Sequence, residues 1–269
     1  GSIGGGIMEH KLVEKARALL PQRGTGVSTM WQHHNKTQAS DRSGMICSGS
    51  QHIAFVPLTQ QHLPLLETIL EEKTPLWLKV TENGLSMTDA GPEGIVLTAH
   101  DAGRWQYLEP LQRQPVAHIF GAGHVGLALS EILHFLGFYV KIYDDREGLN
   151  TLEQNHFADE KHVVGYDRID GFLRSDPVDY AIIMTIGYRN DQLLLRQLAQ
   201  RPWKYIGMLG SAAKIEILKT EMAEEGFDEA FWKGVSAPIG LPISSKTPQE
   251  IAVSIAAEII RVKNVMNDE

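Results

Sequence analysis

The chain has only one cysteine, Cys47, among its 269 residues, so no disulfide can form within it. This excludes a small disulfide-stabilised domain and a metal site built from four cysteines of one chain. We therefore expect no metal ligands among the site residues. Because disulfides are absent, we also expect a reducing, cytoplasmic location.

The sequence also lacks a long apolar run and a block of like charge. The uncharged stretch at 115–130 is interrupted by histidines and glycines, which does not suit a bilayer span, and no segment resembles a secretion signal. The 25 Lys and Arg residues stand against 33 Asp and Glu, a formal net charge of −8. This balance predicts no basic surface for a phosphate backbone, so we expect neither a membrane nor a nucleic acid as a partner.

The chain consists of two consecutive segments that differ in their pattern of helix and strand signals, and it has no internal repeat. Residues 1–113 combine one clear helix, at 9–20, with short strands, and the polar stretch at 22–43 carries loop signals. The other elements expected in this segment are strands at 52–58 and 76–81 and a helix at 61–72.

Residues 114–269 alternate apolar strand runs with helical patterns, which is typical of βαβ units and a parallel sheet. The expected strands are 116–120, 139–143, 162–165, 180–185 and 205–209. The expected helices are 125–136, 169–173, 191–200 and 212–225, with a last helix that begins after a capping box of Thr247 and Glu250. We predict an α/β protein, with a Rossmann-like domain at 114–269 and a smaller α+β domain at 1–113.

A glycine-rich loop joins the first strand of the second segment to its first helix. Gly121, Gly123 and Gly126 form a GxGxxG pattern with the required strand before it and helix after it. Such glycines let the backbone approach a phosphate at the helix N-terminus, although a tight packing turn is the alternative. Asp144 follows Gly121 by 23 positions, close to the usual spacing of a carboxylate that binds ribose hydroxyls. His124 either meets the ligand or is a surface histidine.

Three further features of the sequence each have two possible interpretations. Gly210 and Ser211 precede a helix, and an ordinary capped helix start is favoured there over a second anion cradle. Thr185 ends a strand where ligands of open α/β sheets collect, and Asp191 is either near that ligand or a charge at a helix start. Cys47 lies among glycines and serines, where a lone cysteine is either a small buried residue or an accessible thiolate.

Three consecutive glycines precede the first helix of the chain. The N–H groups of Gly4, Gly5 and Gly6 suit an anion, because successive glycines let the backbone turn sharply. Glu9 follows in the first turn, where a carboxylate complements the helix dipole.

Seven blocks of sequence, taken in order, carry a resemblance to a known family. They lie at 1–9, 44–47, 120–126, 144–146, 206–214, 237–241 and 247–258. Together they resemble the xanthine dehydrogenase accessory family (XdhC/CoxI), from residue 1 to about residue 262. Members normally have a strand region before the glycine triplet, so the resemblance implies that the N-terminal domain is incomplete at its start.

The resemblance implies a cytoplasmic maturation factor rather than a catalyst. Such a factor binds the molybdenum cofactor (molybdopterin), supports its sulfuration and delivers it to an apo xanthine dehydrogenase-type enzyme. A homodimer, and a cysteine desulfurase as a further partner, are also expected. Carried onto this sequence, the motifs make Cys47 the candidate thiol for cofactor or sulfur. The candidate cofactor-binding residues are Gly4, Gly5, Gly6, Glu9, Gly121, Gly123, His124, Gly126 and Asp144.

The chain departs from the family pattern at several motif positions, and two other functions remain open. Relatives have glycine, histidine or arginine where this chain has Ser48, Ile186, Tyr188, Ala212 and Ala213. One alternative is an oxidoreductase that binds NAD(P) at the glycine loop, although no catalytic Tyr-Lys or His-Asp arrangement accompanies it. The other is a protein-binding module with a vestigial nucleotide fold.

Overall fold

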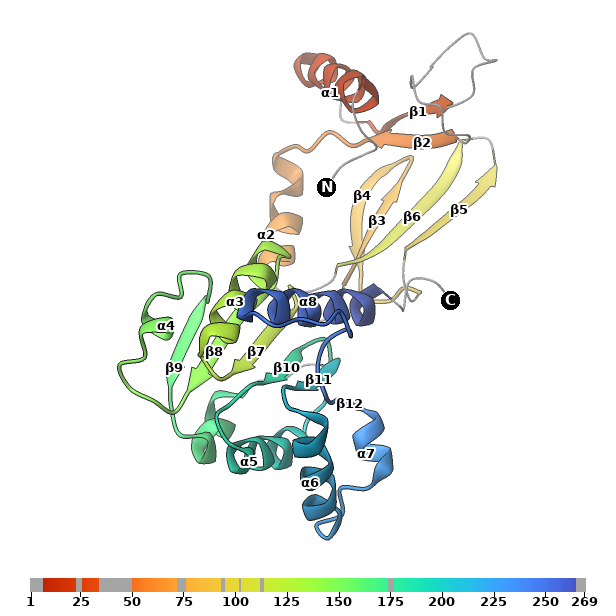
Figure 1. Cartoon of the computed structure of the whole chain (residues 1–269). Helices are drawn as coiled ribbons and strands as arrows, with labels where there is room; N and C mark the ends of the chain where they lie inside the picture. Colours follow the sequence, from red (N-terminus) through yellow and green to blue (C-terminus); the bar gives the residue numbers. More distant parts are fainter. Residues whose placement is uncertain are drawn as a thin grey trace. The chain divides into compact units, whose positions relative to one another are not determined.

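The computed structural model describes residues 7–22, 26–33, 50–71, 76–92, 95–101, 103–111, 114–173 and 177–264. The chain divides into two compact units, Gly1–Arg113 and Gln114–Glu269, each with its own sheets (Figure 1). None of the helices in the described ranges combines the length and apolar character needed to cross a membrane.

The N-terminal unit contains two antiparallel sheets. The first pairs β1 (Ser28–His33) with β2 (Ser50–Phe55), and its register sets Trp31 opposite His52. The second has four strands in the order β4-β3-β6-β5. Its strands are β3 (Leu76–Thr81), β4 (Gly84–Thr88), β5 (Val96–Asp101) and β6 (Arg104–Leu111), and the α-helices of the unit are α1 (Ile7–Leu19) and α2 (Leu63–Glu71).

Most elements predicted for this unit are present. The helices expected at 9–20 and 61–72 correspond to α1 and α2, and the strands expected at 52–58 and 76–81 correspond to β2 and β3. The loop interpretation of 22–43 is wrong in part, because Ser28–His33 forms β1. This segment pairs with β2 along its whole length, so its strand is formed by a partner about twenty residues away in the chain rather than by a strong local pattern.

The C-terminal unit is built on a six-stranded sheet in which every neighbouring pair is parallel. The strand order is β12-β11-β10-β7-β8-β9, so the chain adds strands on one side of β7 and then returns to its other side. The reversal places the carboxyl ends of β7 and β10 at the switch point of the sheet, where open α/β sheets bind ligands. The strands are β7 (Val116–Phe120), β8 (Tyr139–Asp144), β9 (Glu160–Val163), β10 (Tyr180–Ile183), β11 (Tyr205–Met208) and β12 (Val235–Ser236).

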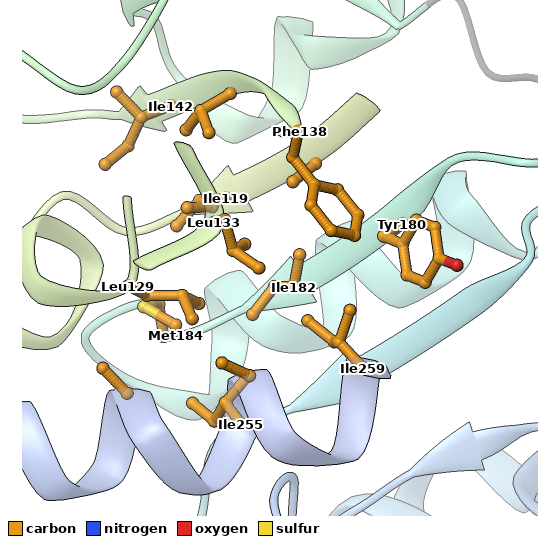
Figure 2. Packing of buried hydrophobic residues seen from close by; sticks show 14 of the residues in the cluster. Ile119, Leu129, Leu133, Phe138, Ile142, Tyr180, Ile182, Met184, Ile255 and Ile259 are labelled. Atoms are coloured by element: carbon orange, nitrogen blue, oxygen red, sulfur yellow. The ribbon is translucent and has the colours of Figure 1, made fainter. Parts of the chain in front are cut away.

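Helices cover both faces of this parallel sheet, because its central strands are apolar on both sides. On one face, Ile119 and Ile182 from adjacent strands pack against Leu129 and against Ile255 and Ile259 (Figure 2). Figure 1 shows the two helices of this layer, α3 and α8, side by side over the sheet. The bounds of the helices are α3 (His124–Phe135), α4 (Asn150–Glu153), α5 (Tyr188–Leu198), α6 (Ala212–Ala223), α7 (Glu229–Lys233) and α8 (Pro248–Asn264).

The opposite face is covered by α5 and α6. Side chains one position along the same strands, such as Phe120 and Ile183, point to this side and pack with Leu194 of α5 and Leu218 of α6. Successive residues of a strand point to opposite faces, so each central strand contributes to both layers of the core. The predicted α/β class with a parallel sheet is confirmed.

The predicted helix starts of this unit are also present. Thr247 and Glu250 form the capping box of α8: the Glu250 N–H donates to Thr247 Oγ1 (3.2 Å) and the Thr247 N–H to Glu250 Oε2 (3.0 Å). Ser211 caps α6 by accepting the Lys214 N–H. The helix expected at 169–173 is instead a 3-10 helix, Tyr166–Phe172. The short elements α4, α7 and β12 were not expected, because they are too short to show a period.

Candidate functional site

The glycine-rich loop lies at the carboxyl end of β7 and turns directly into α3. The Gly121 N–H donates to the carbonyl of Tyr143 on β8 (2.8 Å), which ties the loop to the neighbouring strand. Gly121 has φ +115°, a conformation that disfavours residues with a side chain. A Cβ atom here would also lie 2.4 Å from the backbone oxygen of Met184, which follows β10. Gly121 is therefore required where β7 and β10 meet at the switch point.

The other two glycines of the pattern have different roles. A Cβ on Gly126 would lie 2.3 Å from the Gly121 oxygen, so Gly126 allows the first turn of α3 to pack on the loop. Gly123 is the N-cap of α3, and a Cβ there would meet no atom within 4 Å. The first N–H groups of a helix have no partner inside the helix. The space beside Gly123 is therefore open at the N-terminus of α3, which is the part of a helix that favours an anion.

Asp144, at the end of β8, is buried and holds the loop from the other side. Its Oδ2 accepts the Ala122 N–H (2.7 Å) and the Arg146 Nη2 (2.9 Å), and its Oδ1 accepts the Arg146 backbone N–H (3.0 Å) and Nε (2.8 Å). Burial acts to raise the pKa of Asp144, but the hydrogen bonds from Arg146 and Ala122 outweigh it and hold the pKa below its ordinary value.

These four hydrogen bonds bear on the ribose role that the spacing predicts for Asp144. Each carboxylate oxygen already accepts two donors, so a ribose hydroxyl would have to displace the Arg146 side chain or the Ala122 N–H. The neighbouring Asp145 is exposed and accepts a longer hydrogen bond from Asn190 (3.3 Å). Asp144 thus orders the loop in this structure, and its ribose role stays a prediction.

A second group of polar side chains lies beside the loop at the end of β10. The Thr185 hydroxyl donates to Oδ1 of Asp191 (2.7 Å), and the Lys214 ammonium forms an ion pair with the same carboxylate. Asp191 is fully buried at the start of α5, and burial raises its pKa, an effect that Lys214 and Thr185 offset only in part. A Cβ on Gly121 would lie 3.1 Å from the backbone nitrogen of Thr185, so Thr185 and the ion-paired Asp191 that it contacts lie next to the glycine loop.

The structure brings five of the predicted cofactor-binding residues together where β7 and β8 end: Gly121, Gly123, His124 and Gly126 in the loop and first turn of α3, and Asp144 on β8. His124 is exposed on the first turn of α3, which agrees with either of its two interpretations. Glu9 lies in the first turn of α1, in the other unit. Gly4, Gly5, Gly6 and Cys47 lie outside the described residues. Within the described residues, no three His, Cys, Asp or Glu side chains are grouped to hold a metal ion.

Sequence reasoning missed two members of this site. The sequence singles out the Asp-Asp-Arg block but gives Arg146 no role, whereas Arg146 supplies three of the four hydrogen bonds to Asp144. Lys214 occurs in a second block, and its partner Asp191 lies 23 positions earlier on another helix. Asp144 and Arg146 are only two residues apart, so their ion pair could have been predicted from the sequence. Asp191 and Lys214 are 23 residues apart on different helices, and nothing in the sequence near either residue predicts their ion pair.

Comparison with known proteins identifies the family. The model of the XdhC Rossmann domain matches residues 118–259, which contain the glycine loop, Asp144 and the Lys214 ion pair. The chain belongs to the XdhC family. The resemblance that the sequence blocks suggest is therefore confirmed, and the XdhC match covers most of the C-terminal unit.

One relative of this XdhC protein and one solved structure match 98% of the chain, which includes the N-terminal unit. A probable xanthine dehydrogenase subunit of Bacillus subtilis is 26% identical over 98% of this chain and 84% of that protein. The uncharacterised protein YqeB of Escherichia coli is 32% identical over 56% of this chain, which spans 28% of YqeB. A crystal structure of a xanthine dehydrogenase from Bacillus halodurans has the same fold, with a TM-score of 0.75 and 23% identity, over 98% of this chain and 82% of that one.

Removal of the Asp144 carboxylate is expected to destabilise the XdhC Rossmann domain. Asp144→Ala leaves the buried Ala122 N–H without its acceptor and Arg146 without its counter-ion, so we expect a loss of about 2–4 kcal/mol in the free energy of unfolding. Urea unfolding at neutral pH measures it. The matched control is Asp145→Ala, at the exposed neighbour, with an expected change within about 0.5 kcal/mol. Equal losses in the two variants would contradict the organising role of Asp144.

Proposed function

We propose that this chain is an accessory protein that binds the molybdenum cofactor, supports its sulfuration and delivers it to an apo enzyme of the xanthine dehydrogenase type. Its partners would be that enzyme, a cysteine desulfurase as the sulfur source, and a second copy of the chain in a homodimer. The observation that carries the proposal is the open space beside Gly123 at the N-terminus of α3, inside the segment that matches the XdhC family. The name of the Bacillus subtilis relative supports the choice of recipient enzyme.

The phosphate of the cofactor fits the glycine loop on physical grounds. Gly121 and Gly126 let the backbone approach closely, and Gly123 leaves space in front of the first N–H groups of α3. A helix N-terminus stabilises a negative charge through these N–H groups and the helix dipole. The Lys214 ammonium is already paired with the buried Asp191 carboxylate, so the N–H groups of α3 would carry the binding. The glycine loop would thus hold the phosphate end.

The remaining candidate residues would bind the part of the cofactor that carries the metal and its sulfur ligands. We assign Cys47 to the cofactor or to a sulfur atom, because a thiolate is the reactive form of cysteine in sulfur chemistry. Gly4, Gly5, Gly6 and Glu9 are assigned to the same ligand through the family pattern. When bound, the cofactor supplies the metal centre that the recipient enzyme needs; the chain itself would hold, protect and release it.

Anaerobic loading with the molybdenum cofactor tests this proposal. The full chain is incubated with the cofactor, separated from excess, denatured and oxidised, and the released pterin is measured by its fluorescence. We expect the unmodified chain to retain pterin and Gly123→Leu to retain at least about tenfold less, because the Cβ position of Gly123 is open and the leucine side chain would extend into the space in front of α3. Cys47→Ser is expected to reduce retention as well.

Gly171→Leu is the matched control for Gly123→Leu. Gly171 is also open around its Cβ position and lies in the 3-10 helix Tyr166–Phe172, outside the glycine loop. This control should retain pterin as the unmodified chain does. The proposal fails if the unmodified chain retains none, or if both leucine variants retain equal amounts.

A dinucleotide is the second ligand that a specific observation favours. The strand order of the C-terminal unit and the GxGxxG turn match those of dinucleotide-binding domains. Against NAD(P) stands the Asp144 carboxylate, which is occupied by Arg146 and Ala122. Titration with NADH and NADPH, with a substrate panel, separates the two functions, because an oxidoreductase must show turnover and an accessory protein must not.

A further inference from the structure

The backbone of Ala122, in the middle of the glycine loop, is held by two side chains from outside the loop. The Thr151 hydroxyl donates to the Ala122 carbonyl (2.5 Å), across a separation of 29 positions in the chain. The Ala122 N–H donates to Asp144 Oδ2 (2.7 Å). Thr151 lies in α4, the short helix that follows β8, and has no part in the proposed ligand contacts. Both backbone polar groups of Ala122 are therefore occupied.

The hydrogen bond from Thr151 sets the direction of the next N–H group in the loop. The Ala122 carbonyl and the Gly123 N–H belong to one planar peptide unit, and in the trans form they point in opposite directions. The Gly123 N–H is thus turned away from the Thr151 hydroxyl and from α4. None of the residues that the structure describes accepts this N–H. Thr151 therefore fixes the orientation of an unpaired donor at the N-cap of α3.

Buried residues next to Thr151 hold α4 and the residues after it against α3. Leu152 is 5% exposed and belongs to the apolar core beneath α3. Asn155 is fully buried, and its Nδ2 donates to Ser130 Oγ of α3 (2.9 Å). Ser130 in turn donates to the carbonyl of Gly126 in the first turn of α3 (2.8 Å). The Thr151 hydroxyl is thus positioned before any ligand binds, which lowers the entropy cost of binding.

The partner of Thr151 is unusual for a threonine in a helix. Threonine hydroxyls in helices commonly donate to the carbonyl three or four positions earlier in the same helix. Thr220 of α6 does so, because it donates to the Glu216 carbonyl (2.9 Å). Thr151 donates to the glycine loop instead. Its hydrogen bond therefore acts on the loop rather than on its own helix.

We propose that Thr151 is a positioning residue for the anion site of the glycine loop, because it holds the Ala122 carbonyl and so orients the Gly123 N–H toward a bound phosphate. Thr151 itself does not touch the phosphate. A donor that is already oriented binds an anion without first ordering the loop. The inference rests on the proposed function only in that the glycine loop binds a phosphate, and it does not depend on the rest of the ligand.

Titration of the full chain with inorganic phosphate at constant pH tests this role. Binding is followed by the backbone amide resonances of Gly123 and His124 in NMR spectra, which should shift and saturate in the unmodified chain. Thr151→Val keeps the size of the side chain but cannot donate, so phosphate should bind about tenfold more weakly. Thr151→Ser restores the hydroxyl and should bind within about twofold of the unmodified chain.

Thr220→Val is the matched control for Thr151→Val. It removes the same kind of hydrogen bond, from a threonine hydroxyl to a backbone carbonyl, at an exposed site on α6. This control should bind phosphate as the unmodified chain does. Urea unfolding of the two valine variants should show similar small losses of stability, so that phosphate affinity is what separates them.

Four results would overturn the role of Thr151. These are equal phosphate affinity in Thr151→Val and the unmodified chain, no recovery in Thr151→Ser, equal weakening in Thr220→Val, or no shift of either resonance in the unmodified chain at millimolar phosphate. Failure of the proposed function gives a different pattern. In that case phosphate binds and depends on Thr151, but the unmodified chain retains no pterin after loading with the molybdenum cofactor.

Discussion

Gly121→Ala is expected to lower the free energy of unfolding of the C-terminal unit by about 3 kcal/mol or more. Two costs add at this position. The φ of +115° is unfavourable for alanine, and its Cβ would lie 2.4 Å from the backbone oxygen of Met184, which cannot swing away as a side chain would. Urea unfolding, followed by circular dichroism, measures the change.

Two further substitutions in the same loop sharpen this result. Alanine is normally a better helix residue than glycine by about 1 kcal/mol, yet Gly126→Ala should destabilise, because its Cβ would lie 2.3 Å from the Gly121 oxygen. Gly123→Ala should cost about 1 kcal/mol or less, because its Cβ position is open and its φ is −70°. Similar losses for all three glycines would show that the contacts of Gly121 and Gly126 relax freely.

Acidification is expected to destabilise the C-terminal unit through His118, a fully buried residue of β7. Its ring stacks on Tyr143, and its Nδ1 lies 3.1 Å from the Tyr143 hydroxyl oxygen. Burial, aided by the nearby Lys141 and His162, lowers the pKa of His118 to about 3 although Glu160 acts in the opposite direction. The folded state therefore holds a neutral imidazole that the unfolded state protonates readily.

The sign and size of the effect follow from this difference in pKa. An unfolded histidine has a pKa of about 6.5, so the unfolded state binds more protons as the pH falls between about 6.5 and 3. Stability is present above the unfolded pKa and is lost at up to about 1.4 kcal/mol per pH unit below it, or about 2 kcal/mol between pH 6.5 and 4.5. Asp144, with its lowered pKa, adds a loss in the same direction only below about pH 4.

His118→Phe isolates the histidine contribution. Phenylalanine keeps a flat ring against Tyr143 but cannot titrate, and it removes the hydrogen bond, so the variant should be less stable at pH 7 by about 1–3 kcal/mol. That deficit should shrink by about 2.5 kcal/mol on going to pH 4.5. Unfolding curves at a series of pH values measure it, with His156→Phe at an exposed histidine as the control. Parallel pH profiles for His118→Phe and the unmodified chain would rule out a buried neutral His118.

Much of the C-terminal unit could be predicted because its signals are local. The apolar runs of β7 and β10, the glycine pattern and the capping box of Thr247 depend on residues within a few positions of each other. Their periods and dihedral preferences act before any tertiary contact forms. The N-terminal unit was predicted less completely, since β1 becomes a strand only through pairing with β2.

The sequence by itself determined the α/β class, the glycine loop with its helix, and the family blocks that place the chain among XdhC proteins. Only the tertiary structure decided which glycine is indispensable, that Lys214 pairs with Asp191, and that Thr151 binds the carbonyl of Ala122. The physical reason is the separation of the partners along the chain. Gly121 contacts Met184 because β7 and β10 are neighbours, and that strand order is a property of the whole sheet rather than of any short segment.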